Sequence, residues 1–95
     1  MTIGCAIRAL PEQGMLRLEA VVTVRQAASG SYKFEVSKQG PAGTSRNVQS
    51  GTFDKAAGQD TLLTTVILDG TARGHYRARL SLDSEEFGSI SCVSP

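Results

Sequence analysis

The sequence predicts an all-β fold, in which seven antiparallel strands form a two-sheet sandwich within a single domain that spans residues 1–95. Apolar and polar residues alternate along much of the chain, and a period of two is typical of strands that bury one face. Seven such runs follow one another at intervals of roughly 8–12 residues, with glycine-containing turns between them. No segment has the period of a convincing helix.

The first two expected strands are joined by a short polar turn. The first covers residues 5–10 and ends at Pro11, whose missing N–H cannot serve a central ladder. Residues 12–14 then supply the turn, which ends on a glycine. The second strand covers residues 16–24, where apolar residues alternate with mostly polar ones. Residues 27–30 provide the next turn.

The third, fourth and fifth strands follow the same pattern. Residues 32–37 alternate aromatic residues and valine with lysine, glutamate and serine. Residues 48–53 form a short strand, with Gly51 as a potential break. The polar turn at residues 57–60 leads to residues 62–68, which are rich in the threonine, valine and isoleucine that strands favour.

The last two strands cover residues 76–82 and 87–93, and the full set favours an immunoglobulin-like sandwich over a closed barrel. Tyr76 stands near the start of the sixth strand, where such folds often have a tyrosine corner. In that motif the hydroxyl turns back onto an upstream backbone group. The alternative is an ordinary core tyrosine with its hydroxyl at the surface.

Strand parity also predicts the core, because alternate residues of each strand point to the same side. The side chains expected inside are Leu16, Leu18, Val22, Phe34, Val36, Tyr76, Leu80 and Ile90.

The two cysteines, Cys5 and Cys92, lie near opposite ends of the chain. If the terminal strands run next to each other at one edge, a disulfide can join the first strand to the last. Such a bond persists only in an oxidising compartment, which points to the periplasm or the cell exterior. The alternative is two reduced thiols in a cytosolic protein.

Composition excludes several classes of protein. Ten Lys and Arg against nine Asp and Glu give a net charge of +1, which argues against a dedicated nucleic-acid binder. No apolar run approaches the roughly 20 residues that span a bilayer, so we expect no membrane insertion. Arg8 and Glu12 interrupt the start of the chain, which therefore has no apolar signal-peptide segment. An exported protein would have lost its leader.

The residues needed for catalysis are scarce. His75 is the only histidine, and it stands beside a predicted turn. The sequence has no phosphate-binding glycine loop, nucleophile elbow or metal-ligand cluster, and its cysteines lack Cys-x-x-Cys spacing. We therefore expect no enzyme, no metal and no cofactor.

Charges on one expected sheet face are more informative. In a sandwich of this order the third, sixth and seventh strands share a sheet, and Lys33, Glu35, Arg77 and Arg79 point outward. Arg73 lies nearby in a loop. This excess of cations predicts a local positive field despite the near-neutral total. The alternative is a charged face that only keeps the protein soluble and protects strand edges.

Several segments, in order along nearly the whole chain, resemble the alphaproteobacterial CsgH family of curli assembly inhibitors. They are residues 7–20, 29–32, 47–51, 57–61 and 89–93. The family is a functional relative of enterobacterial CsgC. The resemblance implies an immunoglobulin-like periplasmic chaperone that keeps an amyloidogenic curli subunit soluble and prevents its nucleation before secretion. We expect such a chaperone to act as a monomer.

The resemblance also bears on the site residues. Cys5 and Cys92 match the disulfide positions of the family. The Cys-x-Cys pair of CsgC is missing here, which weakens a redox role. Curli subunits are expected to be rich in glutamine, asparagine and acidic residues, so Lys33, Arg77, Arg79 and Arg73 become the expected steering surface.

A function of another class is an immunoglobulin-like adhesive or structural interaction module of the cell envelope. Carbohydrate binders usually expose tryptophan or tyrosine, and tryptophan is absent here.

Overall fold

A computed structural model of the chain describes residues 3–40, 43–55, 58–70, 75–85 and 87–94. These residues form seven strands, all paired antiparallel. The strands are β1 (Ile3–Glu12), β2 (Met15–Val24), β3 (Ala28–Gly40), β4 (Gly43–Lys55), β5 (Gln59–Asp69), β6 (Tyr76–Ser84) and β7 (Gly88–Ser94). In the described residues, no helix is both long and apolar enough to cross a membrane.

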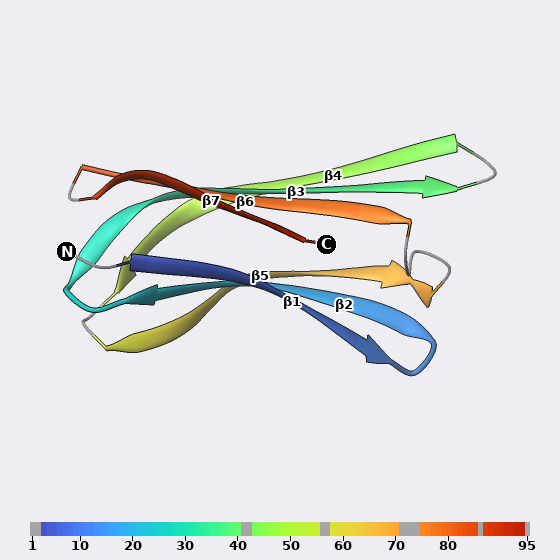
Figure 1. Ribbon diagram of the computed structural model, residues 1–95, viewed down its shortest axis with the longest axis horizontal. Coiled ribbons are helices and arrows are strands. Elements are labelled where there is room, and N and C mark those ends of the chain that lie inside the picture. Colours follow the sequence, from blue (N-terminus) through green and yellow to red (C-terminus); the bar gives the residue numbers. More distant parts are fainter. Residues whose placement is uncertain (1–2, 41–42, 56–57, 71–74, 86, 95) are drawn as a thin grey trace.

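The strands are arranged in two sheets that face each other as layers (Figure 1). The smaller sheet has the order β1-β2-β5, and the larger has the order β4-β3-β6-β7. The molecule is elongated, with extents of 43 × 23 × 18 Å. The predicted all-β sandwich of seven antiparallel strands is confirmed, including the shared sheet of the third, sixth and seventh strands.

The terminal strands run next to each other at one edge, as expected, but they belong to different sheets. β1 and β7 are not hydrogen-bonded neighbours, because each is the outer strand of a different sheet. The two strands face each other along one side of the sandwich, and the Cys5–Cys92 disulfide joins them there with a Cα–Cα distance of 6.1 Å. The bond therefore links the two sheets, at their outer strands rather than through the second and sixth strands.

The core lies between the sheets and is formed mainly by β2, β3 and β6. The side chains of Leu18, Val22, Phe34 and Leu80 are completely inaccessible to solvent. Leu16 and Val36 are also buried, as predicted. All of these face inward because each strand alternates, so packing and strand parity agree.

Two of the predicted core residues are only half-buried. Tyr76 and Ile90 pack against the core from its margin, because Tyr76 begins β6 and Ile90 lies on the outer strand β7. The Tyr76 hydroxyl lies 3.4 Å from Oγ of Ser94. The stretch just before His75 that a tyrosine corner would use, residues 71–74, lies outside the described residues.

Some strand boundaries were predicted wrongly. Ala28, expected in a turn, is buried and begins β3. β4 is much longer than the expected strand and continues through Gly51, where the Tyr32 ring packs over the backbone. A Cβ at Gly51 would lie 2.9 Å from that ring, so glycine here makes room for the tyrosine instead of breaking the strand.

The β1–β2 turn lies within the expected residues 12–14, but β1 continues through Pro11 to Glu12 instead of ending at Pro11. Gln13 and Gly14 both have positive φ angles, 49° and 78°, which is the backbone of a tight two-residue turn of type I′. Glu12 and Met15 close it as paired residues.

Two leucines test the core directly. We expect Leu80→Ala, at a site with no exposed surface, to lower the free energy of unfolding by about 2–5 kcal/mol, because it removes apolar contacts and leaves a cavity. The matched change Leu62→Ala, at a side chain 48% exposed, should cost less than about 1 kcal/mol. Urea unfolding measures both. Equal losses would contradict the assigned strand faces.

The disulfide is expected to stabilise the fold. Unreduced protein should be lighter than reduced protein by the mass of about two hydrogens. Reduction should lower the free energy of unfolding by about 2–5 kcal/mol, because the bond closes a loop of 87 residues in the unfolded chain. Mass spectrometry and urea unfolding give the two numbers. Two alkylatable thiols in protein purified from the periplasm would contradict a structural bond.

Candidate partner-binding face

The outer face of the larger sheet brings together cations from three strands. Lys33 comes from β3, Arg46 from β4, and Arg77 and Arg79 from β6, and all four side chains are exposed. We refer to the surface formed by these four residues as the basic face. Arg73, also predicted to belong to it, lies outside the described residues.

The strand register places these cations in successive rows across the sheet. Arg46 and Arg77 stand on either side of Ser37. In the next row Arg79 stands opposite Glu35, and Lys33 follows one row further on. Rows on one face of a sheet are roughly 7 Å apart, so four cations lie within a patch about two row spacings long.

Arg46 was missed by sequence reasoning. The expected fourth strand began at residue 48, because the polar segment before it lacks the apolar alternation that marks a buried strand. In the structure, β4 pairs with β3 from Gly43 onward and reaches beyond the core. The length of β3 could have indicated this part of β4, because a long strand needs an equally long neighbour to pair with its backbone.

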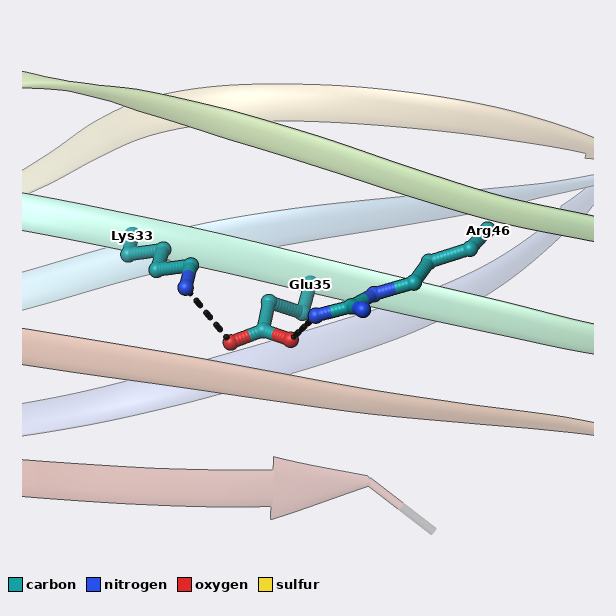
Figure 2. A network of polar contacts seen from close by, with 3 residues as sticks. All are labelled: Lys33, Glu35 and Arg46. Carbon is teal, nitrogen blue, oxygen red and sulfur yellow. Dashed lines mark hydrogen bonds and ion pairs between the residues drawn. The ribbon is translucent and has the colours of Figure 1, made fainter.

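Glu35 is the one carboxylate in the middle of the basic face. Its Oε1 lies 3.3 Å from Nζ of Lys33, and its Oε2 accepts a hydrogen bond from the Arg46 guanidinium. Figure 2 shows the carboxylate lying between these two cations, with one oxygen toward each. The Glu35 side chain is 27% exposed, whereas those of Lys33 and Arg46 are 52% and 60% exposed.

The pKa of Glu35 is lowered from its ordinary value. The hydrogen bond from Arg46 is the largest cause, followed by the one from Lys33, and partial burial opposes both. These contacts favour the ionised carboxylate, so Glu35 stays negative throughout the neutral range.

The other two cations of the basic face, Arg77 and Arg79, differ from Lys33 and Arg46 in having no internal partner among the described residues. Within the described part of the chain, neither the Arg77 nor the Arg79 side chain has a hydrogen bond or an ion pair. An exposed guanidinium with no internal partner can bind a carboxylate in bidentate fashion. Beside Arg77 there is also a hollow of about 320 Å³ with a polar lining, formed by Ser37, Gln39, Thr44, His75 and Tyr76 together with Arg77 itself. The Arg77 and Arg79 end of the basic face therefore has guanidinium donors that a partner could bind.

The outer face of the smaller sheet is different. It exposes large apolar side chains, namely Leu10, Met15, Leu62 and Ile67. Its Arg17 is neutralised, with Glu19 at 3.2 Å and Glu12 at 3.7 Å. The two outer faces are thus chemically distinct: the smaller sheet exposes apolar side chains, whereas the larger sheet brings Arg77 and Arg79 close together with no ion-pair partner in the residues that the structure describes.

Comparison with known proteins decides the family. The family model described as CsgH protein matches residues 4–93. The chain belongs to the CsgH family. The solution structure of R. palustris CsgH is similar, with a TM-score of 0.80 and 34% identity over 97% of this chain and 90% of that one. E. coli curli protein CsgC has the same fold, with a TM-score of 0.85 at 17% identity over 99% of each chain. A comparison with curated protein sequences finds no match.

Membership in the CsgH family places the chain in a curli-related group that is not known to be enzymatic. The family and the disulfide together are consistent with an extracytoplasmic location. Among the described residues, no group of three or more His, Cys, Asp or Glu side chains could hold a metal ion.

The contacts of Glu35 predict how its pKa changes when either cation is removed. In Arg46→Ala we expect the pKa of Glu35 to rise toward its ordinary value, because the main contact that favours the ionised form is lost. Lys33→Ala should raise it less. Carboxyl ¹³C NMR measures both midpoints, and an unchanged midpoint in Arg46→Ala would contradict the network. Because the folded-state pKa is lowered, the stabilisation by these pairs is present at neutral pH and is lost as pH falls through that pKa.

Proposed function

We propose that this CsgH-family protein is a periplasmic chaperone that binds an amyloid-forming curli subunit through its basic face and delays nucleation before secretion. The observation that carries the proposal is the basic face itself, on a sandwich of the curli-related family. Its partner is expected to be acidic and amide-rich, so attraction between opposite charges favours the encounter. We expect the protein to act by binding, without catalysis.

Such a chaperone must bind the amyloid precursor without being recruited into the fibre itself. An amyloid precursor exposes unpaired backbone in strand-forming segments, and any flat apolar strand edge nearby risks being recruited into the fibre. A charged sheet face attracts the chain at long range without offering backbone hydrogen bonds. On the basic face, the backbone groups of β3 and β6 are already used in the sheet, since both are interior strands.

Location and disulfide fit the proposal. A curli subunit must be kept soluble after it leaves the cytoplasm and before it is secreted, and the periplasm is an oxidising compartment in which Cys5–Cys92 persists. Because the bond lies between the outer strands and away from the basic face, we expect reduced protein that remains folded to keep its activity.

Charge reversal tests the surface. In a thioflavin fibrillation assay with a purified curli subunit, wild-type protein should extend the lag at substoichiometric ratios, because nuclei are scarce. The variant Lys33→Glu/Arg77→Glu/Arg79→Glu should shorten that lag toward the value without inhibitor. These side chains are exposed, so its free energy of unfolding should change by less than about 1 kcal/mol.

A matched control separates the face from the total charge. Arg77→Glu/Arg79→Glu and Arg8→Glu/Arg25→Glu change the net charge equally, but Arg8 and Arg25 are exposed outside the basic face. Only the first pair should weaken inhibition. Raising the salt to physiological strength, where the Debye length is about 8 Å, should also weaken the wild type. If the triple variant inhibits as well as wild type at low salt, the basic face is not the binding surface.

A further inference from the structure

Glu35 stands at the centre of the basic face, where a carboxylate from a partner would be expected to bind. In the register of the sheet it lies opposite Arg79 on one side and Val48 on the other. Arg46 and Arg77 belong to the adjacent row, and Lys33 to the row on the opposite side. A partner chain crossing this face would therefore pass over Glu35.

The Glu35 carboxylate bridges cations of the two rows that flank its own. It contacts Lys33 and Arg46, while the described residues contain no ion pair between Glu35 and Arg79, its direct neighbour on β6. Figure 2 shows both oxygens engaged, one by each cation. The four cations are thus divided into two that hold an internal carboxylate and two that hold none.

We propose that Glu35 is an intramolecular competitor for acidic partner segments: it occupies Lys33 and Arg46, leaves Arg77 and Arg79 as the first contacts, and so limits the affinity of the basic face. The biological meaning of this inference rests on the proposed function, but its first test does not. A partner carboxylate gains Lys33 or Arg46 only by displacing Glu35, whereas it meets Arg77 and Arg79 without displacing any group of the described chain.

The competitor also sets specificity. A ligand with one acidic group gains little from Lys33 and Arg46, because it exchanges one carboxylate for another. A segment with acidic groups spaced over several rows binds Arg77 and Arg79 first and then competes for the remaining pair. Competition by Glu35 therefore favours segments with several acidic groups over single anions, because a single anion gains too little to displace Glu35.

The decisive experiment compares two isosteric variants. Glu35→Gln removes the competitor and keeps the side-chain shape. Glu19→Gln changes the net charge equally, at a half-buried glutamate that is ion-paired with Arg17 on the outer face of the other sheet. A fluorescently labelled deca-glutamate peptide is the probe, and anisotropy at low salt gives its Kd. Circular dichroism and thermal unfolding check that both variants fold.

We expect Glu35→Gln to bind the peptide between about twofold and tenfold more tightly than wild type, as expected for release of one or two exposed ion pairs. Its affinity should also fall more steeply with salt. Glu19→Gln should bind like wild type. Equal gains in both variants would mean that net charge alone matters. A Glu35→Gln affinity equal to or below that of wild type would mean that Glu35 does not compete with the peptide. Either result overturns the inference.

A double-mutant cycle gives an independent measure. In the wild-type background, Arg46→Gln should change peptide affinity little, because Arg46 is already occupied. In the Glu35→Gln background the same replacement should weaken binding severalfold, because Arg46 has become available. Arg79→Gln should weaken binding in both backgrounds. An Arg46→Gln effect that is equal in the two backgrounds would contradict competition.

The fibrillation assay then links the competitor to function. If Glu35→Gln extends the lag of the curli subunit further than wild type, competition operates on the proposed partner. If wild type itself does not extend the lag, the proposed function is wrong, while the peptide measurements still decide whether Glu35 competes.

Discussion

The burial of Phe34 on β3 determines where the charges of this protein lie. β3 is an interior strand of the larger sheet and pairs with both β4 and β6. With Phe34 and Val36 turned into the core, Lys33 and Glu35 must point outward, because successive side chains alternate. The register of β3 then places Arg46 on one neighbour and Arg77 and Arg79 on the other. A slip of β3 by one residue would turn Lys33 and Glu35 toward the core and separate them from the arginines of β4 and β6.

The two long sides of the sandwich are closed by different interactions. On one side the Cys5–Cys92 bond holds β1 to β7. On the other side β4 faces β5, where the Thr64 hydroxyl donates to the Gln49 side chain. The covalent closure lies next to the chain ends, where a small domain frays most easily. It therefore holds the two sheets together on that side, since no described strand of one sheet pairs with a strand of the other.

Much of the fold could be predicted because the alternation of apolar and polar residues within each strand shows which side chains face the core. The parity of residues 16–24, 32–37 and 76–82 identified the interior strands, and with them the outward direction of Lys33, Arg77 and Arg79. The ends of strands were less predictable. Residues 43–47 carry no apolar alternation, since that part of β4 extends past the core and is held by backbone pairing with β3. The sequence-based prediction of the basic face missed Arg46 for this reason.

The relation between Glu35 and its neighbours lay beyond the sequence for another physical reason. Parity showed that Glu35 shares a face with Lys33 and Arg79, but it could not show toward which cation the carboxylate turns. That choice depends on the diagonal neighbour Arg46, whose presence depends on the length of β4. The Cys5–Cys92 pairing was more accessible, because only two cysteines exist. Its position between sheets still required the topology.

A net charge of +1 is compatible with a strongly polarised surface because the sheets separate the charges. The outer face of the smaller sheet has more acids than bases, with Glu12 and Glu19 neutralising Arg17 while Asp60 and Asp69 lie along its β5 edge. The larger sheet has the opposite excess around Arg77 and Arg79. A near-neutral total gives the whole molecule only weak long-range attraction or repulsion, whereas at distances below the Debye length each face acts separately. An acidic chain that approaches from solution is therefore attracted to one side of the molecule, and the orientation of that encounter follows from the strand parity that buries Phe34.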